Sequence, residues 1–264
     1  MNQPKPAHLG PAYAAQFQDA AIVAAYPSRP PYPQAVFETL SSLLVAPHVA
    51  LDAGCGTGHI ARRLAPLVQR VDAIDLSARM VAAGRQMAGG DAPNLHWQVA
   101  ALEDATLAGP YGLVVAGESL HWMEWERVMP RLRASLAPGA CLAIVERIEA
   151  PSSWTSALNQ LIHRYSTNRD YQPYDIVVEL ERRGLFVLGG TARTELEPFH
   201  QSVSTYIESM HSRNGFSRDR MRPEDAAAFD AAVAALLAPH TLDGRLTLGI
   251  AASVRWGIPL AAEV

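Results

Sequence analysis

Apolar and polar residues follow one another in blocks that predict strands separated by helices. Short apolar runs typical of buried strands occupy residues 49–55, 70–76, 94–100, 112–118 and 140–148. Segments whose apolar residues recur at helical spacing occupy residues 34–45, 59–68, 77–88 and 124–136. Strands that alternate with helices of about ten residues build a parallel sheet that is covered on both faces. This part of the chain therefore predicts an α/β fold.

The alternation becomes looser after residue 150. Helices are predicted at 153–166, 175–183, 202–213 and 223–237, and strands at 190–197 and 245–256. The first 33 residues are rich in proline, which removes backbone donors, so this segment is not expected to form one helix. Because no linker or repeat interrupts the chain, we expect one domain. Its expected parts are an N-terminal segment at 1–33, a core at 34–150, and further strands at 151–264 with a helical cap at about 202–238.

Composition and charge exclude several classes of protein. The 22 basic and 26 acidic residues give a net charge of −4, which argues against a nucleic-acid partner. Only two cysteines are present, Cys55 and Cys141, so the chain is not a disulfide-stapled secreted scaffold. No apolar run reaches the roughly 20 residues of a membrane span, and the first residues lack the apolar stretch of a signal peptide. The sequence therefore favours a soluble, cytoplasmic protein with no membrane partner.

The stretch most informative for function joins the first predicted strand to a helix. Residues 51–59 read LDAGCGTGH, with glycines at positions 54, 56 and 58. Glycine lets the backbone turn sharply and lets a ligand lie against the main chain, while N–H groups at the helix start provide donors. Asp75 ends the next predicted strand. Because adjacent parallel strands end side by side, its carboxylate is placed to accept hydrogen bonds from a ribose diol.

Two kinds of cofactor fit a glycine loop with a ribose-binding acid. The dinucleotide pattern G-x-G-x-x-G requires its third glycine at position 59, which is His59 in this chain. The pattern present, D-x-G-x-G-x-G with an acid after the next strand, resembles class I S-adenosylmethionine-dependent methyltransferases. A glycine-rich turn that binds no ligand is the alternative interpretation.

The resemblance implies a set of cofactor-binding residues. Asp52, Gly54 and Gly56 would surround the methionine part of S-adenosylmethionine, and Asp75 would hold the ribose. Gly58 belongs to the same set, although close packing of the following helix also explains it.

The residues expected around the adenine ring follow the second and third predicted strands. The family commonly places a small residue beside an acid after the third strand, where this chain has Ala101, Leu102 and Glu103. Leu76 and Met80 would supply apolar contacts to the same ring, although core packing explains these two residues equally well.

The segment after the fourth predicted strand is the expected catalytic face, since ligands of open α/β sheets bind beyond the carboxyl ends of the strands. Residues 111–114 (YGLV) depart from the aromatic-Asp-x-Val sequence of the family. Residues 117–122 (GESLHW), however, resemble the signature of its type 11 branch, which includes trans-aconitate-type and natural-product enzymes. Residues 26–33 (YPSRPPYP) resemble the same branch, where this motif forms a lid over the cofactor.

Each candidate on this face has two interpretations. Methyl transfer from a sulfonium requires positioning of the acceptor and, for oxygen or nitrogen acceptors, a base. His121 has a suitable unperturbed pKa for that base, or it orients the cofactor or a loop. Glu118 either assists His121 or holds a cationic substrate. Trp122 forms a pocket wall or packs in the core, and Tyr26 hydrogen-bonds the cofactor carboxylate or packs the lid.

The sequence thus predicts an S-adenosylmethionine-dependent methyltransferase that acts on an O, N or C atom of a small organic molecule, in secondary metabolism. The resemblance implies a Rossmann-like sheet of seven mostly parallel strands, with an antiparallel last strand near 245–256 and a helical cap. Aromatic residues expected in the cap suit an apolar or planar substrate: Trp154, Tyr165, Tyr171, Tyr174, Tyr206 and Phe216.

Two alternatives remain at this stage. One is an enzyme of the same fold that binds S-adenosylmethionine but catalyses a cyclisation or rearrangement, because binding and chemistry lie in separable residues. The other is a non-catalytic binding protein. No metal site is expected, since the histidines do not fall at ligand spacings, and a monomer or a homodimer is expected.

Overall fold

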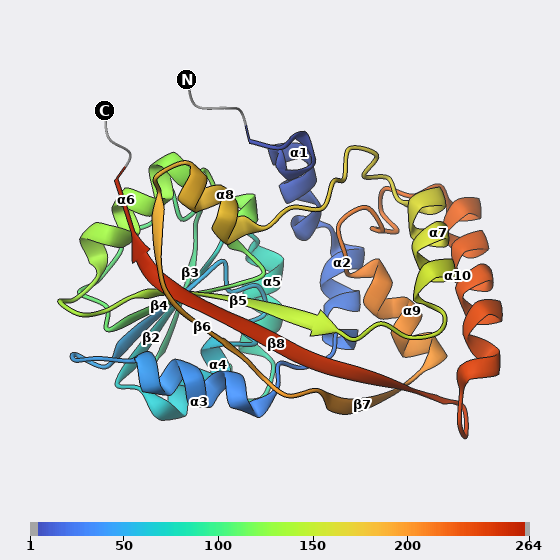
Figure 1. The fold of residues 1–264 in the computed structure, drawn as a ribbon, viewed down its shortest axis with the longest axis horizontal. Helices are drawn as coiled ribbons and strands as arrows, with labels where there is room; N and C mark the ends of the chain where they lie inside the picture. Colours follow the sequence, from blue (N-terminus) through green and yellow to red (C-terminus); the bar gives the residue numbers. More distant parts are fainter. Residues whose placement is uncertain (1–4, 262–264) are drawn as a thin grey trace.

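A computed structural model describes residues 5–261 and confirms an α/β fold built on a mostly parallel sheet (Figure 1). The strands lie in the order β3-β2-β1-β4-β5-β8-β6, and β7 pairs with β8. The parallel strands are β1 (Val49–Ala53), β2 (Arg70–Asp75), β3 (Leu95–Val99), β4 (Leu113–Gly117) and β5 (Leu142–Glu149). The antiparallel partners of β8 (Arg245–Pro259) are β5, β6 (Phe186–Arg193) and β7 (Glu197–Ser202).

Within residues 5–261 the sheet has eight strands rather than the expected seven. The single strand predicted at 190–197 is two strands, because β8 is 15 residues long and pairs with β6 near one end and β7 near the other. Pro198 lies inside β7 opposite Gly249, and a proline disfavours a strand except at the edge of a sheet. Because of this proline, the sequence pattern did not predict β7 as a separate strand.

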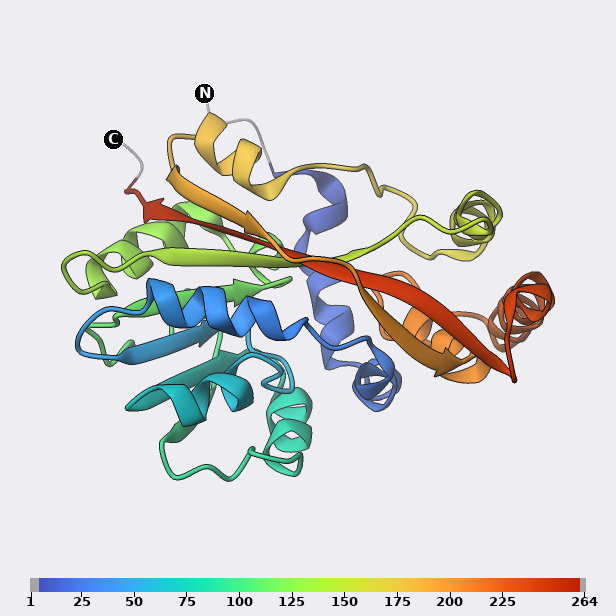
Figure 2. The ribbon, with the colours of Figure 1, turned by 60° about the horizontal axis from the view of Figure 1, so that its bottom comes forward.

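Helices cover both faces of the parallel strands. One face packs against α3 (Gln34–Leu43) and α4 (Ala61–Leu64), and the opposite face packs against α6 (Trp125–Ser135) and α8 (Ile176–Arg182). Figure 2 shows α3 and α8 on opposite sides of the strands. All five residues of β1 are buried, as expected for a strand in the middle of a covered sheet. The helix predicted at 59–68 is shorter, since Pro66 interrupts it and a 3-10 turn (Ala65–Leu67) follows α4.

The helical cap contains three helices with a core of their own. These helices are α7 (Thr155–Tyr165), α9 (Val203–His211) and α10 (Pro223–Leu237). They pack on one another and on Leu246, Leu248 and Ile250 of β8, at the right of Figure 1.

The N-terminal segment runs between the sheet and the cap as a series of short helical turns (Figure 1). Its elements are η1 (Ala7–Leu9), α1 (Pro11–Ala14), η2 (Ala15–Gln18), α2 (Ala20–Ala25) and η3 (Tyr26–Ser28). It is therefore broken into pieces, as its prolines predict. Among residues 5–261, no helix combines the length and apolar character that a membrane crossing requires.

Candidate functional site

The glycine loop follows β1 and has a backbone that only glycine adopts easily. Gly54 has a φ of +71°, and a Cβ at this position would lie 2.6 Å from the Cβ of Ser119. Ser119 follows β4, and its hydroxyl donates a hydrogen bond of 2.5 Å to the carbonyl of Ala53. The close approach of these two chain segments brings the carboxyl ends of β1 and β4 together.

Asp75 connects the end of β2 to this loop. Its Oδ2 accepts a hydrogen bond of 2.7 Å from the N–H of Gly56, and its Oδ1 accepts one of 2.8 Å from the N–H of Ser77. Burial raises the pKa of Asp75, and these two bonds partly oppose the rise. An ionised carboxylate has about four acceptor positions, so two remain for a ligand.

Asp52 and Gly58 do not line the cavity that the loop borders. The Oδ2 of Asp52 accepts a hydrogen bond of 2.8 Å from the N–H of Ala61 and so holds the first turn of α4. A Cβ at Gly58 would lie 2.3 Å from the ring of Trp97, so this glycine permits close packing. Both residues support the loop from the side away from the cavity, so Gly58 has the packing role that was its alternative interpretation, whereas Asp52 was expected to surround the cofactor.

The buried carboxyl of Asp52 predicts a pH-dependent stability. Burial raises its pKa from 3.8 to about 7, so the folded protein keeps a proton that the unfolded chain releases as the pH rises from 4 to 7. The contribution of Asp52 to stability therefore falls across that range. Asp52→Asn removes this titration, so the variant does not lose stability in this way as the pH rises. The free energy of unfolding of the variant, minus that of the parent, should therefore increase by up to about 4 kcal/mol between pH 4 and pH 8. Denaturant unfolding at several pH values measures it, and a constant difference would contradict this account.

A cavity of about 590 Å³ lies at the carboxyl ends of β1, β2 and β4. It brings together ten of the predicted site residues, namely Tyr26, Gly54, Gly56, Asp75, Leu76, Met80, Ala101, Leu102, Glu103 and Glu118. Leu76 is 53% exposed, so it is not a core residue, whereas Met80 is buried. The volume is within the range of sites for ligands of drug size.

Glu118 lies in this cavity between two arginines. Its Oε2 is 3.7 Å from a guanidinium nitrogen of Arg29 and 3.6 Å from one of Arg147. The guanidinium groups lie over the rings of Tyr26 and Tyr32, respectively. Burial alone would raise the pKa of Glu118, but the charges of Arg147 and Arg29 outweigh it and hold that pKa below its usual value. The group is therefore a carboxylate at neutral pH, with two cations beside it.

Arg147 was not singled out in the sequence. It lies on β5 three residues beyond the apolar residue Ile144, on a strand that is fully buried as far as Val145. The sequence did offer one indication of its role, namely a charged residue shortly after a buried run of β5. Because burial of an unpaired arginine is unfavourable, such a residue is expected to have an acidic partner.

His121 lies outside the lining of the cavity. It is in the turn η5 (Leu120–Trp122), with its ring centroid 4.6 Å from that of Trp122 and 6.5 Å from that of Tyr174. Within residues 5–261 its ring nitrogens have no hydrogen-bond partner. Burial lowers its pKa to about 4, although Glu118 opposes the change. His121 is thus a neutral imidazole separated from the cavity by Trp122, which lines it.

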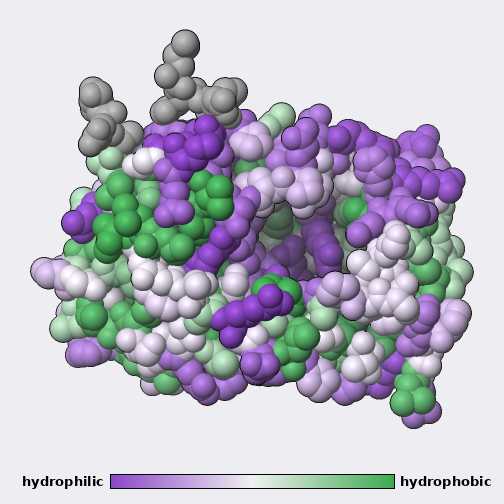
Figure 3. Space-filling view, viewed as in Figure 1, coloured by the Kyte–Doolittle hydropathy of each residue, from purple (hydrophilic) through white to green (hydrophobic). Residues whose placement is uncertain are grey.

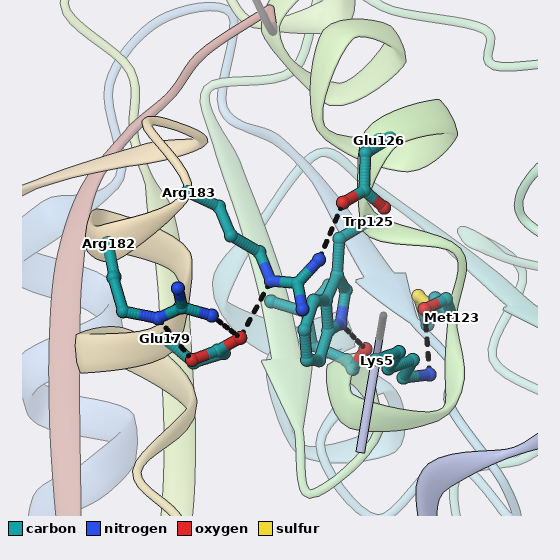
Figure 4. A network of polar contacts seen from close by, with 8 residues as sticks. Lys5, Met123, Trp125, Glu126, Glu179, Arg182 and Arg183 are labelled. Atoms are coloured by element: carbon teal, nitrogen blue, oxygen red, sulfur yellow. Dashed lines mark hydrogen bonds and ion pairs between the residues drawn. The ribbon is translucent and has the colours of Figure 1, made fainter. Parts of the chain in front are cut away.

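The N-terminal segment forms one wall of the cavity and is fastened to the core at Lys5 (Figure 4). Lys5, the only lysine of the chain, donates a hydrogen bond of 3.0 Å to the carbonyl of Met123, and its Nζ lies 5.0 Å from the ring centre of Trp125. Arg183 lies 5.0 Å from the same ring and pairs with Glu126. Burial lowers the pKa of Lys5 to about 8.

Removing this attachment should weaken ligand binding in the cavity. In Lys5→Met the hydrogen bond to the carbonyl of Met123 is lost, so the N-terminal wall of the cavity is less firmly held in the free protein. Part of the binding free energy is then spent on ordering this wall. We expect the dissociation constant of S-adenosylhomocysteine to rise about fivefold, which corresponds to one hydrogen bond of about 1 kcal/mol. Lys5→Arg keeps a cationic donor and serves as the control. Equal affinities of Lys5→Met and the parent in calorimetry would show that the attachment is irrelevant.

The aromatic residues expected to line the substrate side of the cap have other positions. Trp154, Tyr206 and Phe216 are buried in the core of the cap, and Tyr165 packs beside them. Tyr171 and Tyr174 lie instead in the segment between α7 and α8, near η1 and η5. The first group is buried by the packing of the cap helices, and the second packs against His8 and His121.

No group of three or more His, Cys, Asp or Glu side chains among residues 5–261 is arranged to hold a metal ion. Both cysteines are buried, and burial raises the pKa of Cys55 and of Cys141. Neither thiol is therefore prepared to act as a nucleophile.

Comparison with known proteins finds a family model that matches part of the chain around this cavity. Residues 50–139 match the family model described as a methyltransferase domain, and they include the glycine loop and Asp75. Residues 50–139 are therefore similar to a methyltransferase domain. A search of curated proteins finds no match.

Several solved structures share the fold of this chain. A protein from Anaeromyxobacter dehalogenans assigned as a type II methyltransferase is 24% identical, with a TM-score of 0.60 over 88% of this chain and 99% of its own. The [4+2]-cyclase SpnF is 16% identical, with a TM-score of 0.55 over 94% of each chain. The phosphoethanolamine N-methyltransferase 2 of Haemonchus contortus is 13% identical, with a TM-score of 0.52 over 94% of this chain and 59% of its own.

Proposed function

We propose that this protein transfers the methyl group of S-adenosylmethionine to an O, N or C atom of a small organic molecule in secondary metabolism. The observation that carries the proposal is the convergence of the glycine loop and Asp75, which both lie within the residues that match a methyltransferase domain, on one cavity of about 590 Å³. The net charge of −4 supports a small molecule rather than a nucleic acid as acceptor. We propose further that the protein works in the cytoplasm as a monomer or homodimer.

The residues at one end of the cavity fit the nucleoside part of the cofactor. Asp75 would accept hydrogen bonds from the ribose hydroxyls with its two remaining acceptor positions. Leu76, Met80 and Leu102 would contact the faces of the adenine ring, with Ala101 and Glu103 at its edge.

The residues at the other end fit the amino acid part of the cofactor. That part carries an ammonium and a carboxylate, and Glu118 with its two arginines offers the complementary charges. Glu118 would bind the ammonium, and Tyr26, which also lines the cavity, would hydrogen-bond the carboxylate. This assignment makes Glu118 a binding group, because its ion pairs with Arg29 and Arg147 keep it a carboxylate that can hold a cation.

The chemistry requires little beyond positioning and removal of a proton. Bound S-adenosylmethionine supplies an electrophilic methyl on a sulfonium, so the acceptor lone pair bonds to that carbon while the carbon–sulfur electron pair stays on sulfur. Trp122 would form the wall against which the acceptor is held. His121, a neutral imidazole behind that wall, would accept the proton of an O–H or N–H acceptor after a small turn of the Trp122 ring.

Calorimetry with S-adenosylhomocysteine and with NAD tests the cofactor assignment. We expect micromolar binding of S-adenosylhomocysteine and no signal for NAD, because position 59 is histidine and not the third glycine of the dinucleotide pattern. The opposite result would refute the proposal. Incubation with methyl-labelled cofactor and candidate acceptors then separates transfer from cyclisation, since only transfer carries the label into product.

A further inference from the structure

The N-terminal segment connects the cofactor cavity to the helical cap. We call residues 5–29 the N-terminal wall, because many of them line one side of the cavity. The loop between α9 and α10, residues 212–222, is here called the cap loop. Figure 3 shows the surface hollowed between the sheet and the cap on the face in view, and Figure 1 shows α2 between them, where it packs against α9. The N-terminal wall thus bridges the sheet and the cap.

Hydrogen bonds join the N-terminal wall to the cap loop at positions far apart in sequence. The N–H of Gly215 donates a hydrogen bond of 2.9 Å to Oε1 of Gln16, which is 3% exposed, so this bond is shielded from water. The guanidinium of Arg29 donates to the hydroxyl and to the carbonyl of Ser212, over 2.8 and 2.5 Å. These bonds hold the wall in one position relative to the cap loop.

Asp19 makes the strongest of these connections. Its carboxylate accepts hydrogen bonds of 2.6 and 3.0 Å from Arg220 and one of 2.8 Å from the hydroxyl of Ser217, which is fully buried. Burial alone would raise the pKa of Asp19, but the hydrogen bonds from Arg220 and Ser217 outweigh it and hold that pKa below its usual value. Asp19 and Arg220 therefore form an ion pair at neutral pH, and the loss of either partner leaves a largely desolvated charge.

The ion pair lies directly behind residues that line the cavity. Phe17 and Gln18 belong to the lining, whereas Asp19 does not. The ring centroid of Phe17 is 5.3 Å from that of Trp122, which also lines the cavity. The ion pair of Asp19 with the cap loop therefore fixes the position of cavity-lining residues from outside the cavity.

We propose that Asp19 is a positioning residue for the cofactor, and that the cap loop acts through it as a remote part of the cofactor site. This inference rests on the proposed function. A ligand meets Phe17 and Gln18 only while the wall is in place, so its apparent affinity depends on the fraction of molecules in that state. The coupling is reciprocal, because a ligand that requires the wall in place also stabilises the cap loop, which it does not touch.

Calorimetry with S-adenosylhomocysteine tests the effect of the ion pair on the cavity. We expect Asp19→Asn and Arg220→Gln each to raise the dissociation constant about tenfold, and the double variant to raise it no further, because all three lack the same interaction. Arg220→Lys keeps the charge and should recover part of the affinity. The matched control is Arg222→Gln, since Arg222 belongs to the same loop but forms its ion pair with Asp225 of α10.

The outcomes separate this inference from the proposed function. If the parent binds S-adenosylhomocysteine and Asp19→Asn binds it equally well, the role of Asp19 is overturned while the cofactor assignment stays intact. A loss of affinity in Arg222→Gln as large as that in Arg220→Gln would likewise overturn it, because the effect would then be a general one of the loop. Failure of the parent to bind would overturn both proposals.

Hydrogen exchange gives a readout that a merely structural role of Asp19 would not change. In the parent, saturation with S-adenosylhomocysteine should slow amide exchange of residues 212–220 about tenfold, although these residues do not line the cavity. Asp19→Asn, also saturated with the ligand, should lose this slowing. Amides of β6, at the edge of the sheet, serve as the control and should not respond. No slowing in the parent, equal slowing in β6, or equal slowing in Asp19→Asn would each overturn the coupling.

Discussion

Asp75→Ala is expected to weaken binding of S-adenosylhomocysteine by about thirtyfold or more. The substitution removes the acceptors for the ribose hydroxyls and also the bond from the N–H of Gly56 that holds the glycine loop. Hydrogen bonds to a charged group contribute about 1.5–3 kcal/mol each, and thirtyfold corresponds to about 2 kcal/mol. Calorimetry measures the dissociation constant directly.

Two further variants make the Asp75 experiment specific. Asp75→Asn keeps one acceptor and should fall between the parent and the alanine variant. Asp91→Ala removes an exposed carboxylate that does not line the cavity and should bind as the parent does. An Asp75→Ala protein that folds and binds S-adenosylhomocysteine with unchanged affinity would exclude Asp75 as the ribose ligand.

His121→Ala should lower kcat by about 10²–10⁴-fold for an acceptor that loses a proton, which is the usual contribution of a general base. The dissociation constant of the cofactor should change by less than about threefold, since its binding residues are in the glycine loop and at Asp75. His121→Gln keeps a hydrogen-bonding group without a titratable nitrogen. Near-full activity of the glutamine variant would limit His121 to orienting the acceptor, and loss of cofactor binding in the alanine variant would place it in the cofactor site.

The pH profile adds a second test of His121. Burial and the nearby positive charges of Lys5 and Arg29 favour its neutral form, while Glu118 opposes them, and its pKa is about 4. The imidazole therefore becomes protonated only as the pH falls through about 4, and the rate should show no inflection near 6.5 that depends on His121. An inflection near 6.5 that disappears in His121→Gln would mean that the ring is solvated in the working enzyme.

Much of the core of the fold follows from local pattern. The parallel strands could be predicted because they are short apolar runs in a covered sheet, and the glycine loop because its residues are contiguous. Asp75 also follows, since it ends the strand beside the loop. β7 could not be predicted, because a proline such as Pro198 fits only an edge strand. That β7 is an edge strand follows from its pairing with β8 alone, which the sequence pattern does not show.

The parts of the site that depend on long-range contacts could not be predicted. Arg29 and Arg147 meet at Glu118 from positions 118 residues apart in sequence, and only the fold brings them together. The motif predicts that Asp52 lies at the cofactor, but its carboxylate accepts a hydrogen bond from the N–H of Ala61. Aromatic residues of three segments likewise pack on one another although they show no common spacing in the sequence.

A crystal structure of the complex with S-adenosylhomocysteine tests the central claim most directly. The account predicts that both ribose hydroxyls lie within about 2.6–3.2 Å of the Asp75 carboxylate, that the amino acid end lies beside Glu118 and Tyr26, and that the sulfur faces Trp122. A ligand bound outside this cavity, or a ribose without contact to Asp75, would contradict it.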